Sequence, residues 1–455
     1  MKILQKPNSL IFDLLSGGAG NGAGNYKLSQ FAFLKNINES FVMFNTLTRE
    51  LLSLSEDEFN YCKKEKFQPD ENNPLFCGLR DKYFLVPEET DELKRYKEIL
   101  SVYRCFQKNS RIAQYKIFTT TFCNARCFYC FEEGMRQVSM TEETAENIVK
   151  YILKTSKDGQ IVLYWFGGEP LCNIPVIDYI CTRLNEENKP FISKIITNGY
   201  LLDEKTVKKA RELWKLEFAQ ITLDGTEDEH NKRKAYVHPA ESPYTKTLRN
   251  IELLLKAGVK VISRLNFDEN NVDNITELLD LLAVKFRKYE NFRAYPTILS
   301  VDWLNQHSFR SAETTDYLHE KYVELIKKSE GYGFSKPGKL PTNPKPYYCM
   351  AANPLCATIS AEGDLYTCQS CDDKMRYGDV VSGITKPEII NSWHNCLETQ
   401  KKCDTCKFLP ECSTFNKCPD DKTFCALDTE FAVERKIRNI LQSPAAAEDE
   451  EEFCD

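Results

Sequence analysis

The stretch Thr121–Glu133 reads TFCNARCFYCFEE and places Cys123, Cys127 and Cys130 within eight residues. A structural zinc site uses four ligands, and disulfides use cysteines in pairs. Three thiolates on one short loop instead suit a metal centre with one open coordination position, such as a [4Fe–4S] cluster whose fourth iron is free. The alternatives are a zinc site with a distant fourth ligand, and thiols that are simply buried.

The composition limits the classes of protein to consider. A chain of 455 residues with 42% apolar side chains predicts two or three domains with large cores. The net charge of -7 argues against an extended nucleic-acid surface. No apolar run approaches the ~20 residues of a membrane span, and Pro7 and Asp13 interrupt the apolar N-terminus, so we expect a cytoplasmic protein. Thiols stay reduced there, which favours metal ligation for the cysteines that gather between Cys349 and Cys425.

Strand and helix patterns alternate from about residue 110 to 335. The strand candidates are residues 115–120, 161–166, 192–197, 218–223, 259–267 and 291–299, and amphipathic stretches such as 140–155 and 244–258 lie between them. Six such βα units predict an α/β fold with a parallel sheet, rolled or open, and an active site at the carboxyl ends of the strands. The cysteine loop follows the first of these strands.

The cysteine loop resembles the C-x3-C-x-φ-C signature of radical S-adenosylmethionine (SAM) enzymes, in which Tyr129 is the aromatic residue φ. The resemblance continues in the family's order through GGEP (Gly167–Pro170), ITNG (Ile196–Gly199), ITLDG (Ile221–Gly225) and EHNKRKAY (Glu229–Tyr236). It implies a partial (β/α)6 barrel, similar to a TIM barrel, over residues 109–340.

The same resemblance implies roles for individual residues. The three cysteines would hold the cluster, and its open iron would bind the amino and carboxylate groups of SAM. The family's SAM contacts would fall on Tyr129 through its backbone, on Gly167, Gly168 and Glu169 at the methionine ammonium, and on Thr222 at the ribose or carboxylate. Relatives usually carry arginine where this chain has Lys234, with Arg233 adjacent, so the carboxylate partner stays open between these two.

The cysteine-rich region, residues 341–432, resembles the SPASM domain of peptide-modifying radical SAM enzymes. The resemblance implies two auxiliary [4Fe–4S] clusters, and therefore three clusters in all. Cluster I would use Cys349, Cys356, Cys368 and Cys418, and cluster II would use Cys403, Cys406, Cys412 and Cys425. The five residues between Cys412 and Cys418 depart from the usual three. Cys371, Cys396 and Cys454 have no assigned role, and a zinc ribbon on Cys403 and Cys406 is the alternative.

The N-terminal region has its own pattern. Residues 31–36 and 40–45 alternate as a hairpin, 48–62 and 89–105 are helical in pattern, and 82–87 favour a strand. We expect residues 1–28 to be a flexible glycine-rich segment, and 433–455 to be a helix and an acidic tail. The unit 29–108 resembles the winged-helix element with which ribosomal-peptide maturases bind a leader peptide as an added strand. The alternative is a packing extension of the barrel.

Together these resemblances imply a maturase of ribosomally made peptides. Such an enzyme cleaves SAM to a 5'-deoxyadenosyl radical, removes hydrogen from a precursor peptide and installs a cross-link. A thioether, as in sactipeptides and ranthipeptides, is favoured, and a carbon–carbon bond of the streptide type is the variant. The electron donor would be a flavodoxin or ferredoxin, and neither nucleic acid nor membrane is an expected partner.

Three other functions compete with cross-linking. A sulfatase-maturase-like enzyme would form formylglycine, and its subfamily uses Asp as a base directly after the third auxiliary cysteine. Gln369 stands there, after Cys368, and an amide does not accept a proton at neutral pH. The others are a peptide epimerase and a non-catalytic iron–sulfur scaffold. No catalytic residue is assigned from the sequence.

Overall fold

The computed structural model describes residues 1–16, 24–105, 111–299, 311–336, 338–343, 346–347, 349–399, 401–412 and 425–442. The side chains of residues 312, 402 and 425–428 lie outside this description.

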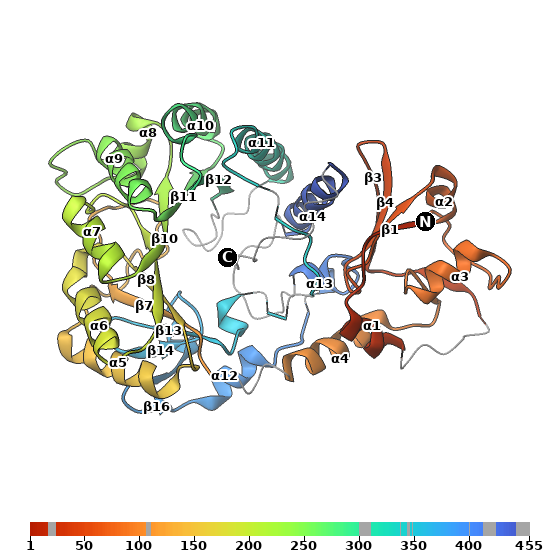
Figure 1. Cartoon of the computed structure of the whole chain (residues 1–455), viewed down its shortest axis with the longest axis horizontal. Helices are drawn as coiled ribbons and strands as arrows, with labels where there is room; N and C mark the ends of the chain where they lie inside the picture. Colours follow the sequence, from red (N-terminus) through yellow and green to blue (C-terminus); the bar gives the residue numbers. More distant parts are fainter. Residues whose placement is uncertain are drawn as a thin grey trace.

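Six parallel strands lie side by side in chain order and form the central sheet (Figure 1). They are β7 (Gln114–Thr120), β8 (Ile161–Gly167), β9 (Phe191–Thr197), β10 (Leu216–Leu223), β11 (Lys260–Phe267) and β12 (Phe292–Ile298). The six predicted strands and their order are therefore confirmed, because each pairs in parallel with the next. Among the described strands β12 is an end strand, so the sheet is an open α/β barrel wall.

Helices cover the convex face of this wall in Figure 1. They are α5 (Glu142–Thr155), α6 (Ile174–Glu186), α7 (Glu204–Glu212), α8 (Glu227–Lys234), α9 (Pro243–Lys256), α10 (Val272–Phe286) and α11 (Ala312–Gly331). Successive strand residues point to opposite faces. On β8, Leu163 and Trp165 belong to the core beneath the helices, so Tyr164 and Phe166 face the concave side. The concave face is where a parallel barrel presents its ligand-binding side chains.

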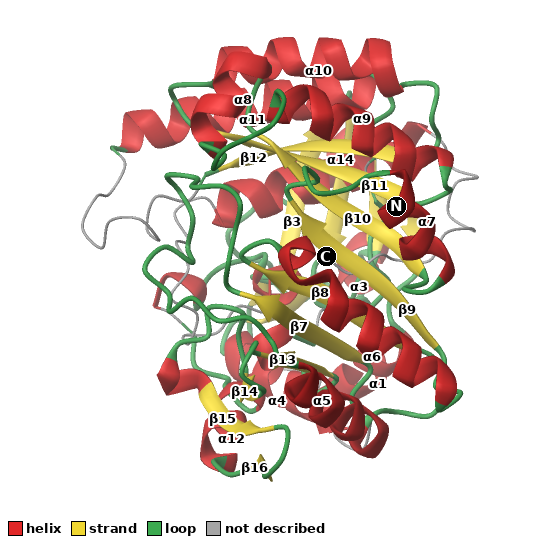
Figure 2. Ribbon diagram, turned by 90° about the vertical axis from the view of Figure 1, so that its left-hand side faces the viewer, coloured by secondary structure: helices red, strands yellow, loops and turns green. Residues whose placement is uncertain are grey.

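The cysteine-rich region continues the same sheet. Strand β13 (Cys356–Ile359) pairs in parallel with β7, and β14 (Asp364–Tyr366), β15 (Arg376–Asp379) and β16 (Gly383–Ile384) follow in antiparallel order to give ten strands. Helices α12 (Pro387–His394), α13 (Leu409–Cys412) and α14 (Cys425–Gln442) complete it. Figure 2 shows β13 and β14 beside β7 at one end of the sheet.

The N-terminal unit is built on a four-stranded sheet with the order β1-β5-β4-β3. These strands are β1 (Lys2–Gln5), β3 (Ala32–Ile37), β4 (Ser40–Asn45) and β5 (Leu51–Leu54). The predicted hairpin is confirmed, with φ of 50° and 64° at Asn38 and Glu39 in its turn. Five further elements surround it: α1 (Ser9–Ser16), β2 (Tyr26–Leu28), α2 (Glu56–Tyr61), α3 (Pro74–Asp81) and β6 (Leu85–Pro87), followed by α4 (Glu92–Cys105).

Two expectations for this unit are wrong in part. The helical pattern over 48–62 holds only for α2, because Leu51–Leu54 is a strand whose side chains enter apolar clusters on both faces of the sheet. Burial on both faces outweighs helix propensity. Residues 1–28 also contain order, since β1 pairs with β5 and α1 packs in the unit. The stretch 17–23 lies outside the described residues.

The N-terminal sheet packs against the cysteine-rich region. Phe33 on β3 lies 5.3 Å, ring to ring, from Phe408, and Val433 of α14 joins the same apolar cluster. The buried guanidinium of Arg49 forms an ion pair with Glu411. The first and last parts of the chain therefore share one interface. In the part of the chain described, no helix is long and apolar enough to cross a membrane.

Candidate active site

The three cysteines lie on the loop that follows β7, as the motif predicts. The N–H of Cys130 donates to the carbonyl of Cys127 at 3.1 Å, which closes a turn. The N–H of Arg126 donates to the carbonyl of Lys234 at 2.9 Å, which ties the loop to the end of α8. All three thiols are half-buried, and burial raises the pKa of each. Deprotonation of these thiols therefore needs a compensating positive charge, which a bound metal centre supplies.

The glycines of GGEP let the next loop approach the cysteine loop. A Cβ on Gly168 would lie 2.6 Å from the carbonyl oxygens of both Thr121 and Phe122. Gly167 has φ of 124°, and a Cβ there would collide with the carbonyl oxygen of Thr120. These contacts need residues without a side chain. The pair thus fixes the distance between the β7 and β8 loops.

Glu169 is buried and held by three donors. One carboxylate oxygen accepts from the Thr197 hydroxyl at 2.6 Å and from the Leu171 N–H at 3.1 Å, and the other accepts from the Asn198 N–H at 2.8 Å. Burial raises the pKa of Glu169, and these hydrogen bonds oppose the rise. A carboxylate has about four acceptor sites, so Glu169 retains capacity for a further donor such as an ammonium group.

A buried triad joins the cysteine loop to the end of β10. The Lys234 ammonium donates to the Tyr129 hydroxyl at 2.9 Å and lies 3.6 Å from the Asp224 carboxylate. The Tyr129 hydroxyl donates to Asp224 at 2.5 Å. Burial disfavours the charge on Lys234, but Asp224 and Cys127 outweigh it and raise the pKa of Lys234. A permanent cation therefore lies beside the cysteine trio.

Arg233 is committed elsewhere. Its guanidinium makes two bonds to Asp268, at 3.0 and 2.7 Å, and one to Glu229 at 2.5 Å. It also lies 5.2 Å from the centre of the Phe128 ring. This bidentate pairing fixes α8 against the end of β11. Of the two cations that the sequence leaves open, the geometry favours Lys234 for the site.

Thr222 lies on the concave face of β10. Its neighbours Ile221 and Leu223 belong to the helix-covered core, so the alternation turns Thr222 inward, in register with Arg264 of β11. This placement is compatible with a ligand contact.

A fourth cysteine lies near the trio. Burial, and then the charges of Glu169, Cys127 and Cys172, raise the pKa of Cys123 to about 12. Cys172 is on the turn after GGEP. Within the described residues, however, no three His, Cys, Asp or Glu side chains converge closely enough to hold one metal ion. A [4Fe–4S] cluster differs from a single-ion site, because its thiolates bind separate irons.

Comparison with known proteins gives the same class. Residues 117–282 match the family model described as the Radical SAM superfamily. These residues form a radical SAM domain. Radical SAM cyclopropyl synthase TigE of Paramaledivibacter caminithermalis is 23% identical to the chain, over 84% of the chain and 87% of that protein. GTP 3',8-cyclase of Clostridium perfringens is 30% identical over 36% of the chain and half of its own length.

The fold also has a counterpart among solved structures. Native anSMEcpe with bound AdoMet superposes with a TM-score of 0.56 at 16% identity, over 73% of the chain and 99% of that protein. At this identity the likeness concerns the fold alone. It agrees with the open barrel wall formed by β7 to β12.

A radical SAM domain implies SAM and one [4Fe–4S] cluster, and the residues present fit them. Three buried polar atoms near the cysteine loop have no hydrogen-bond partner among the described residues: an oxygen of Asp224, an oxygen of Glu132 and the amide nitrogen of Asn124. Buried polar atoms are normally satisfied, so these atoms are suited to a bound ligand. The thiol trio would supply the donor set for the cluster.

Sequence reasoning missed Asp224 and Glu132 as candidates. Asp224 lies inside the quoted ITLDG motif, and its position directly after a buried strand was a usable signal. Glu132 follows the cysteines, and burial, then the charge of Glu169, raises its pKa to about 8. Nothing in the local pattern distinguishes it from the exposed Glu133.

The radical SAM sheet also carries a half-buried lysine, Lys116, beside the cysteine-rich region. The Lys116 ammonium on β7 donates to the side-chain oxygen of Gln369 and lies 4.8 Å from the centre of the Phe166 ring. Burial lowers the pKa of Lys116 to about 8, and the charges of the cysteines nearby partly oppose this lowering. These are, in order of effect, Cys368, Cys356, Cys349 and Cys371.

The residues predicted for cluster II are only partly described. The Cys406 N–H donates to the Cys403 carbonyl at 3.1 Å, and Cys412 ends α13. Cys403, Cys406 and Cys396 pack against the apolar cluster that contains Phe31 of the N-terminal unit. Cys418 and Cys454 lie outside the described residues, as does the side chain of Cys425 at the start of α14.

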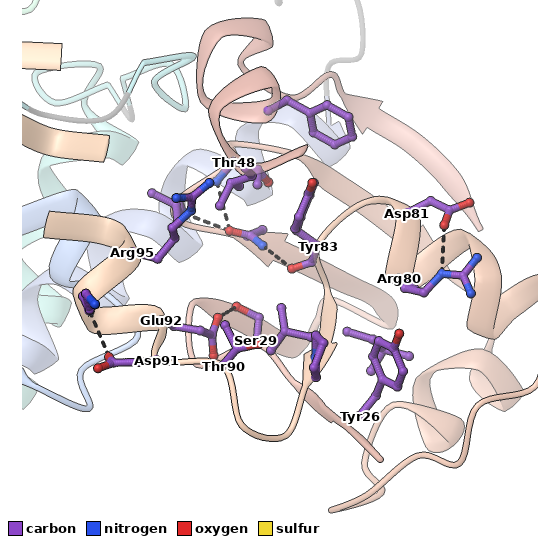
Figure 3. A pocket seen from close by; sticks show the side chains of 18 of the residues that line it. Tyr26, Ser29, Thr48, Arg80, Asp81, Tyr83, Thr90, Asp91, Glu92 and Arg95 are labelled. Atoms are coloured by element: carbon purple, nitrogen blue, oxygen red, sulfur yellow. Dashed lines mark hydrogen bonds and ion pairs between the residues drawn. The ribbon is translucent and has the colours of Figure 1, made fainter. Parts of the chain in front are cut away.

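A cavity of about 480 Å³ lies in the N-terminal unit (Figure 3). Leu15 and Val86 contribute apolar surface, and Thr90, Arg80 and Arg95 also line it. The cavity borders both β2 and β6, which form a separate two-stranded sheet. It therefore combines a strand edge with a space large enough for a side chain.

Proposed function

We propose that this protein is a radical SAM peptide maturase that removes hydrogen from a ribosomally made precursor peptide and installs an intramolecular cross-link. The observation that carries the proposal is the combination, in one chain, of the radical SAM site with an N-terminal β-sheet unit packed on the cysteine-rich region. The match to TigE supports it, because it extends over 84% of the chain and thus beyond the barrel.

SAM bound to a reduced [4Fe–4S] cluster supplies a 5'-deoxyadenosyl radical. The chain's own residues position and enclose the ligand. Glu169 offers a buried carboxylate to the methionine ammonium, and Lys234 offers a cation to a carboxylate. Gly168 allows the two loops to meet at the distance that both contacts need. Holding the reacting groups in fixed contact lowers the entropic part of the reaction barrier.

A peptide is the substrate class that the fold supports best. The structure of anSMEcpe with bound AdoMet and Cp18Cys peptide has a TM-score of 0.51 to this chain at 16% identity. A barrel of this shape therefore accommodates a peptide alongside AdoMet. The proposed electron donor is a flavodoxin or ferredoxin, and the proposed compartment is the cytoplasm.

Two considerations bear on the type of bond, and they favour different answers. For a thioether, the 5'-deoxyadenosyl radical takes one hydrogen atom from a carbon, the thiol loses its own proton, and the remaining electron passes to an acceptor, for which we propose auxiliary cluster I. This route needs no base from the protein, and Gln369 offers none. The similarity to a cyclopropyl synthase favours a carbon–carbon bond instead. We keep the thioether as the first proposal and the carbon–carbon bond as the second. Formylglycine formation gains no support. The Gln369 side chain is a neutral amide that accepts a hydrogen bond from Lys116, and it cannot act as the base that this reaction needs.

The product of the native precursor peptide tests the bond. With SAM and a reductant, we expect a mass loss of two hydrogens, because one carbon–hydrogen and one further bond to hydrogen are replaced by the cross-link. One cysteine should become resistant to alkylation, as shown by mass spectrometry. The same loss with every cysteine alkylatable would assign a carbon–carbon bond. An unchanged mass with deuterium taken up from solvent would mean epimerisation and contradict cross-linking.

We further propose that the leader of the precursor binds the N-terminal unit at β6 and the adjoining cavity. Peptides that add a strand to a sheet gain affinity from backbone bonds and specificity from side-chain pockets. Strand β6 pairs with β2 on one edge and borders the cavity, whereas β1 and β3, the end strands of the four-stranded sheet, do not line it. The alternative of a mere packing extension predicts no peptide affinity.

Filling this cavity tests leader binding. Thr90→Trp should weaken binding of the labelled precursor at least about tenfold, since tenfold corresponds to ~1.4 kcal/mol of lost contacts. SAM cleavage without peptide should be unchanged. Glu89→Trp, on the exposed neighbouring residue, is the matched control. Equal affinity of both variants would count against the cavity. Deleting the whole unit is a poorer test, because it would expose the apolar surface around Phe408 and Val433 that the unit covers.

The auxiliary clusters belong to the same proposal. Cys403, Cys406, Cys412 and Cys425 are the proposed ligands of cluster II. Cys349, Cys356 and Cys368 are proposed for cluster I, with Cys418 from the family pattern. The turn at Cys403 and Cys406 supports the first set.

A further inference from the structure

Three C-x-x-C segments of this chain adopt the same turn. The N–H of the second cysteine donates to the carbonyl of the first at 3.1 Å in Cys127–Cys130, at 3.1 Å in Cys403–Cys406 and at 3.2 Å in Cys368–Cys371. The first two segments carry predicted cluster ligands at both ends. The third carries Cys371, for which the sequence offered no role.

Cys371 is held in a demanding conformation. Its φ is 50°, in the left-handed region that non-glycine residues seldom occupy. The residue is half-buried, and both Cys368 and Cys371 pack against the small cluster that contains Tyr366 and Trp393. A residue keeps a strained backbone conformation only where its surroundings hold it, and such residues are common at functional sites.

The other cysteines of this region lie on the same side of the sheet. Thr358 of β13 pairs with Lys116 of β7, and Cys356 stands two residues earlier, so Cys356 and Thr358 share the face of Lys116. The Thr358 hydroxyl donates to the sulfur of Met350 at 3.9 Å, so the segment that carries the neighbouring, exposed Cys349 lies beside β13. Gln369, inside the third turn, accepts from the Lys116 ammonium.

We propose that Cys371 is a ligand of auxiliary cluster I, in the position that the family pattern gives to Cys418. The inference deepens the proposed function and rests on its auxiliary clusters. The four ligands of cluster I then all lie within residues 349–371. Cluster I no longer depends on Cys418, whose five-residue separation from Cys412 departs from the family pattern.

The position of Lys116 agrees with this ligand set. A cluster with four thiolates carries net negative charge, and burying it requires compensation. Lys116 provides one cation on the same face of the sheet, where it pairs in register with Thr358 and donates to Gln369 inside the third turn.

The test uses the full chain with Cys123, Cys127 and Cys130 replaced by alanine, so that only auxiliary clusters remain. This parent should hold about eight irons after anaerobic reconstitution. Adding Cys371→Gly should lower the count to about four and remove one of two EPR signals of the reduced protein. Glycine suits the positive φ, so the fold is not penalised. Adding Cys418→Ala should leave both signals, and Ser370→Ala, in the same turn, is the matched control.

The outcomes separate this inference from the proposed function. A parent with about eight irons that Cys371→Gly leaves unchanged would overturn the role of Cys371 and spare the auxiliary clusters. A parent that holds zinc or no metal would overturn both. If the circular-dichroism signal shows that Cys371→Gly does not fold, Cys371→Ser takes its place as the test. Serine would bind the cluster through oxygen instead of sulfur, and this change of ligand must alter the EPR signal. An unaltered signal in that variant rejects the inference.

Discussion

Replacing Cys123, Cys127 and Cys130 together with alanine is expected to abolish SAM cleavage and to remove about four irons per chain. The proposed cluster ligands are these three thiolates, and their joint removal would leave the cluster without protein ligands on this loop. Cleavage is measured as 5'-deoxyadenosine and methionine formed with dithionite. We expect a fall of at least ~1,000-fold, equivalent to about 4 kcal/mol in the barrier.

Cys172→Ala is the matched control, because this thiol lies near Cys123 on the next loop. It should retain iron and cleavage, since the fourth iron must stay open for SAM. If Cys172→Ala loses as much iron as the triple variant, Cys172 is a fourth ligand and the open position does not exist. Purified protein with stoichiometric zinc and no iron–sulfur absorbance, even when prepared without oxygen, would contradict the cluster itself.

Gly168→Ala is expected to weaken SAM binding at least about 100-fold, or ~2.7 kcal/mol, and to abolish detectable cleavage. The added Cβ would lie 2.6 Å from two backbone carbonyl oxygens, those of Thr121 and Phe122. Backbone cannot yield as a flexible side chain does, so the cysteine loop must move away from Glu169. Isothermal titration of the anaerobic holoprotein with SAM measures the effect.

Gly331→Ala is the control for this substitution. Gly331 ends α11, and nothing lies within 4 Å of an added Cβ. Alanine there should be neutral or stabilising by up to about 1 kcal/mol. If Gly168→Ala binds SAM as tightly as Gly331→Ala does, the close approach of the two loops is not required for the site.

Periodicity predicted the barrel because its strands and helices each bury one regular face. Every strand from 115–120 to 291–299 was found, in order. The helix expected over 48–62 was partly wrong, since Leu51–Leu54 gains more from burial between two layers than from helix formation. The order in β1 likewise depends on pairing with β5, about 50 residues away, which local sequence does not encode.

For the site, motif order predicted the cysteine trio, the glycines and Glu169 as candidates, and the structure places them on the adjoining loops that follow β7 and β8. It did not choose between Arg233 and Lys234, which are adjacent in sequence and similar in charge. The structure separates them: Arg233 is bonded to Asp268, and Lys234 reaches Tyr129. Adjacent residues on a helix point in different directions, so Arg233 and Lys234 meet different partners. Sequence spacing alone does not reveal which partner each side chain meets.

The sequence by itself determined the class of chemistry, since three thiols at fixed spacing and four loop motifs in order are local features of the chain. Only the tertiary structure brought Lys116, Gln369 and Cys371 together and laid the N-terminal sheet on residues 403–412. These contacts join residues separated by more than 200 positions. They arise because apolar faces and buried charges find partners wherever folding places them, whatever their distance along the chain.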